Sequence, residues 1–259
     1  MLSHRVLVAS CLVVAALTAN PALAQPAKPK DGPLGMTFVA LPKATFYMGG
    51  GGGKAGKKTN IQSDFEIAIH TVTQGQWQEV MGTNPSWCSR DGKGKDKVKD
   101  IKDEDLKHFP VETVSWNDAQ EFIKKLNEKE KGKGFQYRLP SEEEWEYACR
   151  GGATSEEECS YDYYFAKPTN FLSPRDANFL YDKGRTTKVG SYPSNKLGLY
   201  DMHGNVWQWT SSQDGAGRVA RGGGWGSDAT HCRAATREGN DPGIRVSFGG
   251  FRLARVPVG

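Results

Sequence analysis

The chain has 259 residues, of which 37% are hydrophobic and 25% are charged. Basic and acidic residues are nearly balanced, at 34 and 30, which excludes a charged disordered tail and a strongly basic nucleic-acid binder. It has 31 glycines, well above the usual frequency of about 7%, without a three-residue period, and 7 tryptophans. We therefore expect a globular, turn-rich domain, a monomer with no nucleic-acid partner and no membrane span in its body.

The first 24 residues have the layout of a secretory signal. Arg5 precedes an apolar run from Val6 to Leu17 that is too short to span a bilayer, and an A-x-A cleavage site ends at Ala24. We expect residues 1–24 to be a signal peptide and the protein to be exported, to the periplasm or outside the cell. Processing as a lipoprotein at Cys11 is the alternative. Residues 25–35 are rich in proline and lysine and are predicted to be a disordered linker.

Short strands and one helix are predicted next. Residues 38–41 and 45–48 are typical of strands separated by Pro42, and residues 65–69 of a further strand. The glycine run 49–53 lacks the spacing of a phosphate-binding loop and is interpreted as a hairpin tip. Residues 73–81 have a helical pattern. The lysine- and aspartate-rich stretch 91–107 is predicted to be a solvated loop.

Two further helices have clear start signals. Ser115 is a predicted N-cap for a helix over residues 116–131, and Ser141 with Glu144 forms a predicted capping box for the next helix. Gly151 and Gly152 follow that second helix. Beyond them, short apolar pieces alternate with glycine, proline, asparagine and aspartate as far as residue 259.

Four cysteines remain after removal of the signal. In an oxidising compartment we expect one or two structural disulfides among them, with a free reactive thiol as the alternative. The sequence leaves the pairing open. These cysteines lack the C-x-x-C spacing that is typical of zinc sites. These residues are Cys88, Cys149, Cys159 and Cys232.

An ordered set of motifs resembles the formylglycine-generating-enzyme family, also called sulfatase-modifying factors. The most specific are RLPSEEEWEYACRGG and GLYDMHGNVWQW. The matching segments are 46–49, 72–77, 110–119, 138–152, 198–209, 221–225, 232–235 and 250–253. The resemblance implies an α+β, C-type-lectin-like fold over residues 36–259, loop-rich, with two helices and short twisted sheets. Most tryptophans would then belong to its core.

The resemblance also implies structural calcium. Calcium prefers six to eight oxygen ligands on adaptable loops. One family site falls on Asp201, Gly204, Val206 and Gln208, where glutamine stands in place of the usual glutamate. A second falls on Asn178, Phe179 and Asp182. The alternative for these residues is simple turn capping.

The catalytic pair of the family is missing. The enzymes use two cysteines to bind copper(I), which soft thiolates select. Counted back from Pro242, the two positions carry Ala229 and Ala234, so copper is not expected. Cys232 lies between them and is interpreted as a packed or disulfide-bonded residue. Formylglycine formation by the copper route is therefore not expected.

Two functions stay open. The first is a divergent oxidoreductase acting on a peptide or small molecule, for which no catalytic residue can be named. The second is a non-catalytic binding module with a C-terminal binding face for a peptide, protein or small-molecule ligand. The layout of residues 223–252 is similar to that of lectin-fold variable proteins made by diversity-generating retroelements. The predicted binding residues are Trp225, Ser227, Asp228, Thr230, His231, Arg237 and Asn240. Glu238 is a further polar residue expected to be exposed on this face.

Overall fold

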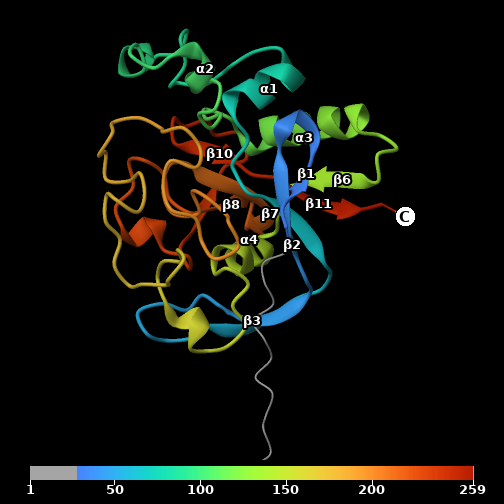
Figure 1. The fold of residues 1–259 in the computed structure, drawn as a ribbon, viewed down its shortest axis with the longest axis vertical. Helices are drawn as coiled ribbons and strands as arrows, with labels where there is room; N and C mark the ends of the chain where they lie inside the picture. Colours follow the sequence, from blue (N-terminus) through green and yellow to red (C-terminus); the bar gives the residue numbers. More distant parts are fainter. Residues whose placement is uncertain (1–27, 259) are drawn as a thin grey trace, which may run out of the picture.

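The computed structural model describes residues 28–258, so the predicted signal peptide lies outside the described residues. Short strands and helices alternate with long loops, and the segment between α4 and β7 runs as irregular loops beside the sheets (Figure 1). The helices are α1 (Gln74–Met81), α2 (Asp103–Leu106), α3 (Trp116–Lys129) and α4 (Glu142–Cys149). The strands are β1 (Lys30–Asp31), β2 (Thr37–Leu41), β3 (Ala44–Met48), β4 (Lys57–Ile61), β5 (Phe65–Ala68), β6 (Phe135–Arg138), β7 (Trp207–Asp214), β8 (Gly217–Arg221), β9 (Arg237–Asn240), β10 (Gly249–Phe251) and β11 (Ala254–Pro257).

The elements predicted with start signals are confirmed. Thr73, Ser115 and Ser141 each accept the backbone N–H of the third helical residue, whose side chain accepts the cap N–H in return. These reciprocal bonds satisfy donors that a helix start leaves free. The stretch 91–107 differs from the expectation in one respect, since it contains the short helix α2. The glycine run lies between the paired strands β3 and β4, as expected for a hairpin tip.

The first sheet has the order β1-β2-β5-β11-β6, and its strands are antiparallel. The late strand β11 lies between β5 and β6, with Ala254 opposite both Ile67 and Arg138. On one side of this sheet, α1 and α3 cover a core in which Trp77 stacks on Phe122 at a centroid distance of 5.4 Å. The last residues of the domain therefore complete its first sheet.

Part of the predicted linker is structured, which corrects the expectation for residues 25–35. Lys30 and Asp31 form β1 and pair with β2. The ammonium group of Lys30 contacts the buried carboxylate of Glu66, which also accepts from Arg255 Nε at 2.7 Å. A buried carboxylate is stable only with such partners. The contact between Lys30 and Glu66 therefore helps to hold β1 against the sheet.

The second sheet, called the β7 sheet below, has the order β10-β7-β8-β9. β10 runs parallel to β7, and the other pairs are antiparallel. Because side chains alternate along a strand, Gln208 and Arg221 share one face and Trp209, Ala220 and Glu238 share the other. Helix α4 packs on the first of these faces, where its Trp145 donates to Gln208 Oε1 at 2.8 Å.

Buried amides hold the long loops between α4 and β7. Asn195 donates to the carbonyls of Ala148 and Cys149, and its Oδ1 accepts from the N–H groups of Leu197 and Leu199. Asn205, with a left-handed φ of 65°, exchanges two hydrogen bonds with the backbone of Thr187 in the same way. These side chains satisfy backbone groups that a buried loop would otherwise leave unpaired.

Candidate functional site: an aromatic groove on the beta7 sheet

A groove of about 430 Å³ lies on the face of the β7 sheet that carries Trp207 and Trp209. The strands supply its floor through Trp207, Trp209, Ala220, Glu238 and Asn240. Two loop segments close it from the other side, one around residues 226–231 and one around residues 244–248. The floor is therefore set by a rigid sheet, and the walls are loops. Its full lining is Trp207, Trp209, Ala220, Gly226, Ser227, Asp228, His231, Glu238, Asn240, Ile244, Val246, Phe248 and Gly249.

The polar wall of the groove is organised around Asp228. Its Oδ1 accepts from the Thr230 hydroxyl at 2.6 Å, from the backbone N–H of His231 at 3.0 Å and from His231 Nδ1 at 2.8 Å. These hydrogen bonds hold the pKa of the Asp228 carboxyl well below its usual range. The other ring nitrogen of His231 lies 3.9 Å from Glu238 Oε1. The imidazole thus lies between two carboxylates and forms a T-shaped pair with the Trp207 ring at 6.4 Å between centroids.

Exposed apolar side chains gather around the same groove. Ile244 and Phe248 line it and are 40% and 36% exposed. At the neighbouring rim, Leu180 and Tyr181 are 60% and 64% exposed. Their backbone N–H groups donate to the carbonyls of Ser227 and Trp225, so the rim is tied to the wall of the groove.

The rim segment has an unusual backbone. Leu180 and Tyr181 both have left-handed φ values, 56° and 58°, which cost free energy for residues with a side chain. Tyr181 packs edge-on against Trp225 at 5.3 Å between ring centroids. Backbone strain that is held in place by its surroundings is concentrated at functional sites in proteins.

The structure separates the predicted binding residues into two groups. Ser227, Asp228, His231 and Asn240 line the groove. The other three lie around it. Trp225 is only 8% exposed and stacks on Trp87, Thr230 positions Asp228, and Arg237 pairs with Glu142 and Asp214 on the opposite face of the sheet.

The aromatic floor lies outside the set of predicted binding residues. Trp207 and Trp209 are among the tryptophans that the family resemblance places in the core, and Trp209 is 3% exposed, with its indole N–H donating to the carbonyl of Val114. The alternation Trp207-Gln208-Trp209 was the available signal, since a strand places both indoles on one face. Ile244 and Phe248 carry no such periodic signal, because they lie in a loop.

The four predicted disulfide cysteines are free and buried in the described part of the chain, which differs from the expectation of one or two disulfides. They belong to three separate clusters of apolar side chains, where each thiol fills space as a small apolar group. Burial raises the pKa of Cys88 to about 11 and that of Cys149 and Cys232 to about 12. The thiols are therefore protonated at neutral pH, and the reactive-thiol alternative gains no support either.

The two alanines at the expected copper positions face different parts of the core. Ala234 is fully buried in the cluster that contains Trp145. Ala229 packs beside Cys232 and Tyr163, and its carbonyl accepts from the Tyr163 hydroxyl at 2.6 Å. Neither position offers a ligand atom to a metal.

The first predicted calcium set does not fit a cation as it is arranged. Gln208 Oε1 accepts from Trp145 and, at 2.6 Å, from the buried guanidinium of Arg252, while Gln208 Nε2 donates to the Asp201 carbonyl. Of the Asp201 carboxylate, Oδ2 accepts from Gly190 and only Oδ1 is buried without a partner. Arg252 already supplies a positive charge beside Gln208. Gly204 and Val206 lie in the same turn and are buried.

The second predicted set is also largely engaged. The Phe179 carbonyl accepts from the backbone of Asp182, whose carboxylate pairs with Lys183 at 2.8 Å. Asn178 Nδ2 donates to the carbonyl of Arg185 and to Asn205 Oδ1, while Asn178 Oδ1 is buried without a partner in the described residues. Within residues 28–258, no three His, Cys, Asp or Glu side chains are grouped as metal ligands. Calcium binding remains a prediction.

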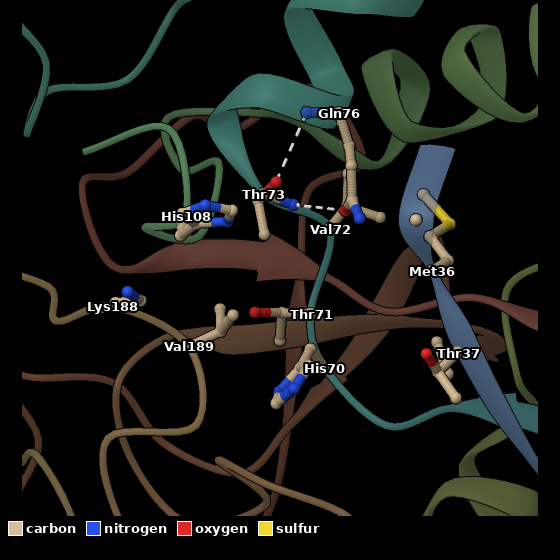
Figure 2. A pocket seen from close by; sticks show the side chains of 12 residues that line it. Met36, Thr37, His70, Thr71, Val72, Thr73, Gln76, His108, Lys188 and Val189 are labelled. Atoms are coloured by element: carbon tan, nitrogen blue, oxygen red, sulfur yellow. Dashed lines mark hydrogen bonds between the residues drawn. The ribbon is translucent and has the colours of Figure 1, made fainter. Parts of the chain in front are cut away.

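A second cavity, of about 210 Å³, lies beside the start of α1. Figure 2 shows His70 and Thr71 on the segment after β5, with His108 and Lys188 across the cavity. Thr71 Oγ1 and His70 Nδ1 are buried without partners, and burial lowers the pKa of His70 to about 4. The cavity has both polar and apolar walls and is large enough for ordered water beside its polar groups. None of the predicted binding residues lines it.

These features define a class of protein: a loop-rich, lectin-like α+β domain with an aromatic groove on its C-terminal sheet. The chain belongs to the family of the sulfatase-modifying factor enzyme 1-like domain, whose model matches residues 24–257. No helix in the described residues combines the length and apolarity needed to cross a bilayer.

Three relatives illustrate the range of the family. The chain is 37% identical over 164 residues to the inactive C-alpha-formylglycine-generating enzyme 2 of Bos taurus, covering 56% of this chain but only 50% of that relative. It is 30% identical over 242 residues to the chaperone protein LppX of Paenibacillus barcinonensis, covering 71% of this chain and 80% of the other. Among solved structures, Treponema denticola variable protein 1 superposes with a TM-score of 0.71 at 25% identity, over 88% of this chain and 98% of the other.

Proposed function

We propose that this protein is a non-catalytic binding module whose ligand is a peptide segment held in the groove of the β7 sheet. One observation carries the proposal: Leu180, Tyr181, Ile244 and Phe248, four of the six large apolar side chains exposed in residues 28–258, lie in or beside this groove. Apolar surface gathered in one place marks interaction sites, and aromatic side chains dominate their binding energy.

Two further facts favour binding over oxidation. The described thiols are buried and protonated, and alanine occupies both positions where the resemblance places copper ligands. Similarity to a relative named inactive and to a variable protein is consistent with a fold retained for recognition. The divergent oxidoreductase has no observation of its own in its favour.

The test begins with selection of a phage-displayed random peptide library against the purified protein, followed by calorimetry of the selected peptides. We expect Trp207→Ala to weaken binding at least tenfold, while Trp116→Ala, a half-buried tryptophan outside the groove, leaves binding unchanged. Selected peptides that bind Trp207→Ala as well as the wild type would overturn the proposal, as would a library without groove-dependent binders.

A direct assay addresses catalysis. A cysteine-containing sulfatase peptide is incubated with the protein, copper and oxygen, and its mass is measured. We expect an unchanged thiol. Conversion to the aldehyde would refute the non-catalytic proposal.

We also propose that the protein is exported, on the signal pattern of residues 1–24. Expression in a bacterial host should yield a secreted form whose N-terminus is Gln25. Lipid attachment at Cys11 would support the lipoprotein alternative, and an intact N-terminus in the cytoplasm would contradict export.

A further inference from the structure

The charged side chains that line the groove indicate which chemical class of ligand it would bind. Within the described residues, its lining includes two carboxylates, Asp228 and Glu238, and one imidazole, but no lysine or arginine. The same lining includes the half-buried Trp207 and Trp209, which is 3% exposed. Aromatic rings beside two carboxylates attract a cation through both the ring quadrupoles and the negative charges.

The carboxylates retain free acceptor capacity. All three hydrogen bonds to Asp228 end on Oδ1, which leaves Oδ2 unengaged in the part of the chain described. The Glu238 carboxylate has only the 3.9 Å approach of His231 Nε2 among its described neighbours. The side chains of Asp228 and Glu238 are 51% and 46% exposed, so an incoming donor can reach both.

The nearby arginines are paired elsewhere. Arg237 pairs with Glu142 at 2.9 Å, Arg245 with Asp118 at 2.6 Å, and Arg233 approaches Asp162 at 3.4 Å. These guanidinium groups therefore pair with other carboxylates and leave His231 as the basic side chain closest to Asp228 and Glu238 among the described residues that line the groove.

Resting on the proposed function, we infer that the groove selects a peptide segment that inserts a lysine or arginine side chain. The aliphatic stem of that side chain would lie on the indoles, and its charged end would reach Asp228 and Glu238. Exposed apolar side chains in the groove (Ile244, Phe248) and on its rim (Leu180, Tyr181) cover more surface than one small amine would fill. This extent favours a chain as the occupant over a free amine.

The experiment compares three fluorescein-labelled decapeptides of alternating phenylalanine, glycine and lysine. One carries free lysines, one carries Nε-acetylated lysines, and one carries glutamate in their place. Binding is followed by fluorescence anisotropy at low and high salt. We expect the lysine peptide to bind at least tenfold more tightly than either other peptide, a difference of about 1.4 kcal/mol. This preference should shrink at high salt.

Two double variants separate a local effect from net charge. Asp228→Asn with Glu238→Gln removes the two carboxylates of the groove. Glu142→Gln with Asp214→Asn makes the same charge change on the opposite face, where these residues pair with Arg237. We expect the first pair to abolish the preference for lysine without weakening binding of the acetylated peptide. The second pair should leave the preference within twofold of wild type.

The outcomes distinguish this inference from the proposed function. If the acetylated peptide binds as tightly as the lysine peptide and both depend on Trp207, the groove is a binding site but the charge inference is wrong. Retention of the lysine preference in the first double variant also overturns the inference. A small amine, n-butylamine, that competes at the same concentration as the lysine peptide would overturn the choice of a chain as occupant.

Discussion

The two faces of the β7 sheet have opposite characters. The face against α4 is buried yet carries charges: Glu146 contacts both Arg150 and Arg221, and all three side chains are fully buried. The groove face carries indoles and opens to solvent at one end. In most half-buried sheets the apolar side chains face the core and the polar ones face water. The buried guanidinium groups of Arg150 and Arg221 share the one carboxylate of Glu146, whereas Ile244 and Phe248 on the groove side remain 40% and 36% exposed to solvent.

This difference teaches which face serves stability and which serves recognition. Buried charges survive only with partners of opposite charge and full hydrogen bonding, so each depends on its neighbours. Exposed aromatic residues contribute little to folding and are retained where a partner covers them. Variants on the two faces should therefore separate loss of stability from loss of binding.

The largest effect is expected at the buried cluster. Glu146→Gln should lower the free energy of unfolding by about 3–5 kcal/mol, because it leaves two buried guanidinium groups without their carboxylate. Glu142→Gln on the same helix weakens a pair with Arg237, whose side chain is 41% exposed, and should cost about 1 kcal/mol or less. Urea unfolding measures both. Equal costs for the two variants would contradict the assignment of the buried face to stability.

The second effect is a loss of stability at acidic pH. His203 is buried, and its Nε2 accepts from the backbone N–H of Tyr164, so its Nδ1 donates to the Cys232 carbonyl. Burial lowers the pKa of His203 to about 4. A lowered histidine pKa contributes stability above the unfolded value of 6.5, and this contribution is lost as the pH falls toward 4.

From pH 7 to pH 5, His203 should therefore cost the wild type about 2 kcal/mol of unfolding free energy. His203→Gln should reduce the slope of stability against pH by that amount, whatever its effect at pH 7. The matched control is His231→Gln, which changes an exposed histidine in the groove. An unchanged slope in His203→Gln would show that the histidine is not buried neutral.

The third effect tests the strained rim. Leu180→Gly should raise the free energy of unfolding by about 0.5–1 kcal/mol, because glycine adopts the left-handed backbone without the cost of a side chain. The same change should weaken peptide binding, since it removes an exposed apolar side chain. Lys183→Gly, in the same loop and without a left-handed φ, should lower stability instead. A loss of stability in both variants would argue against strain at Leu180.

The smallest effect is expected from calcium. Because Gln208 is engaged by Arg252 and Trp145, calcium at millimolar concentration should shift the unfolding midpoint by less than about 1 °C after treatment with a chelator. Differential scanning calorimetry measures this shift. A rise of several degrees that Asn178→Ala abolishes would support calcium binding at the predicted second set.

Sequence patterns predicted the parts of this molecule that depend on local chemistry. The capping pairs at Ser115 and Ser141 follow from residues three positions apart, and the family motifs identified the fold. The predicted metal ligands and disulfides depended on distant partners. The sequence does not show that Arg252, 44 residues after Gln208, donates to its side chain. It also does not show that Asn195 and Asn205 hydrogen-bond to the backbone of the loops between α4 and β7.

The site was half predictable for the same reason. Ser227, Asp228 and His231 lie in one short polar loop and were predicted together, but Ile244 and Phe248 reach the groove only through the tertiary fold. The strand pattern around Trp207 could be read from the sequence, but it does not reveal whether the indole faces the core or the groove.

The position of β11 has a consequence for how the domain is made. Its central place in the first sheet means that β5 and β6 have no strand between them until residue 257 has been synthesised. The buried Glu66 likewise lacks Arg255 until then. This sheet therefore closes only when nearly the whole chain has been synthesised, and until then the facing edges of β5 and β6 have no strand to pair with and are open to proteases.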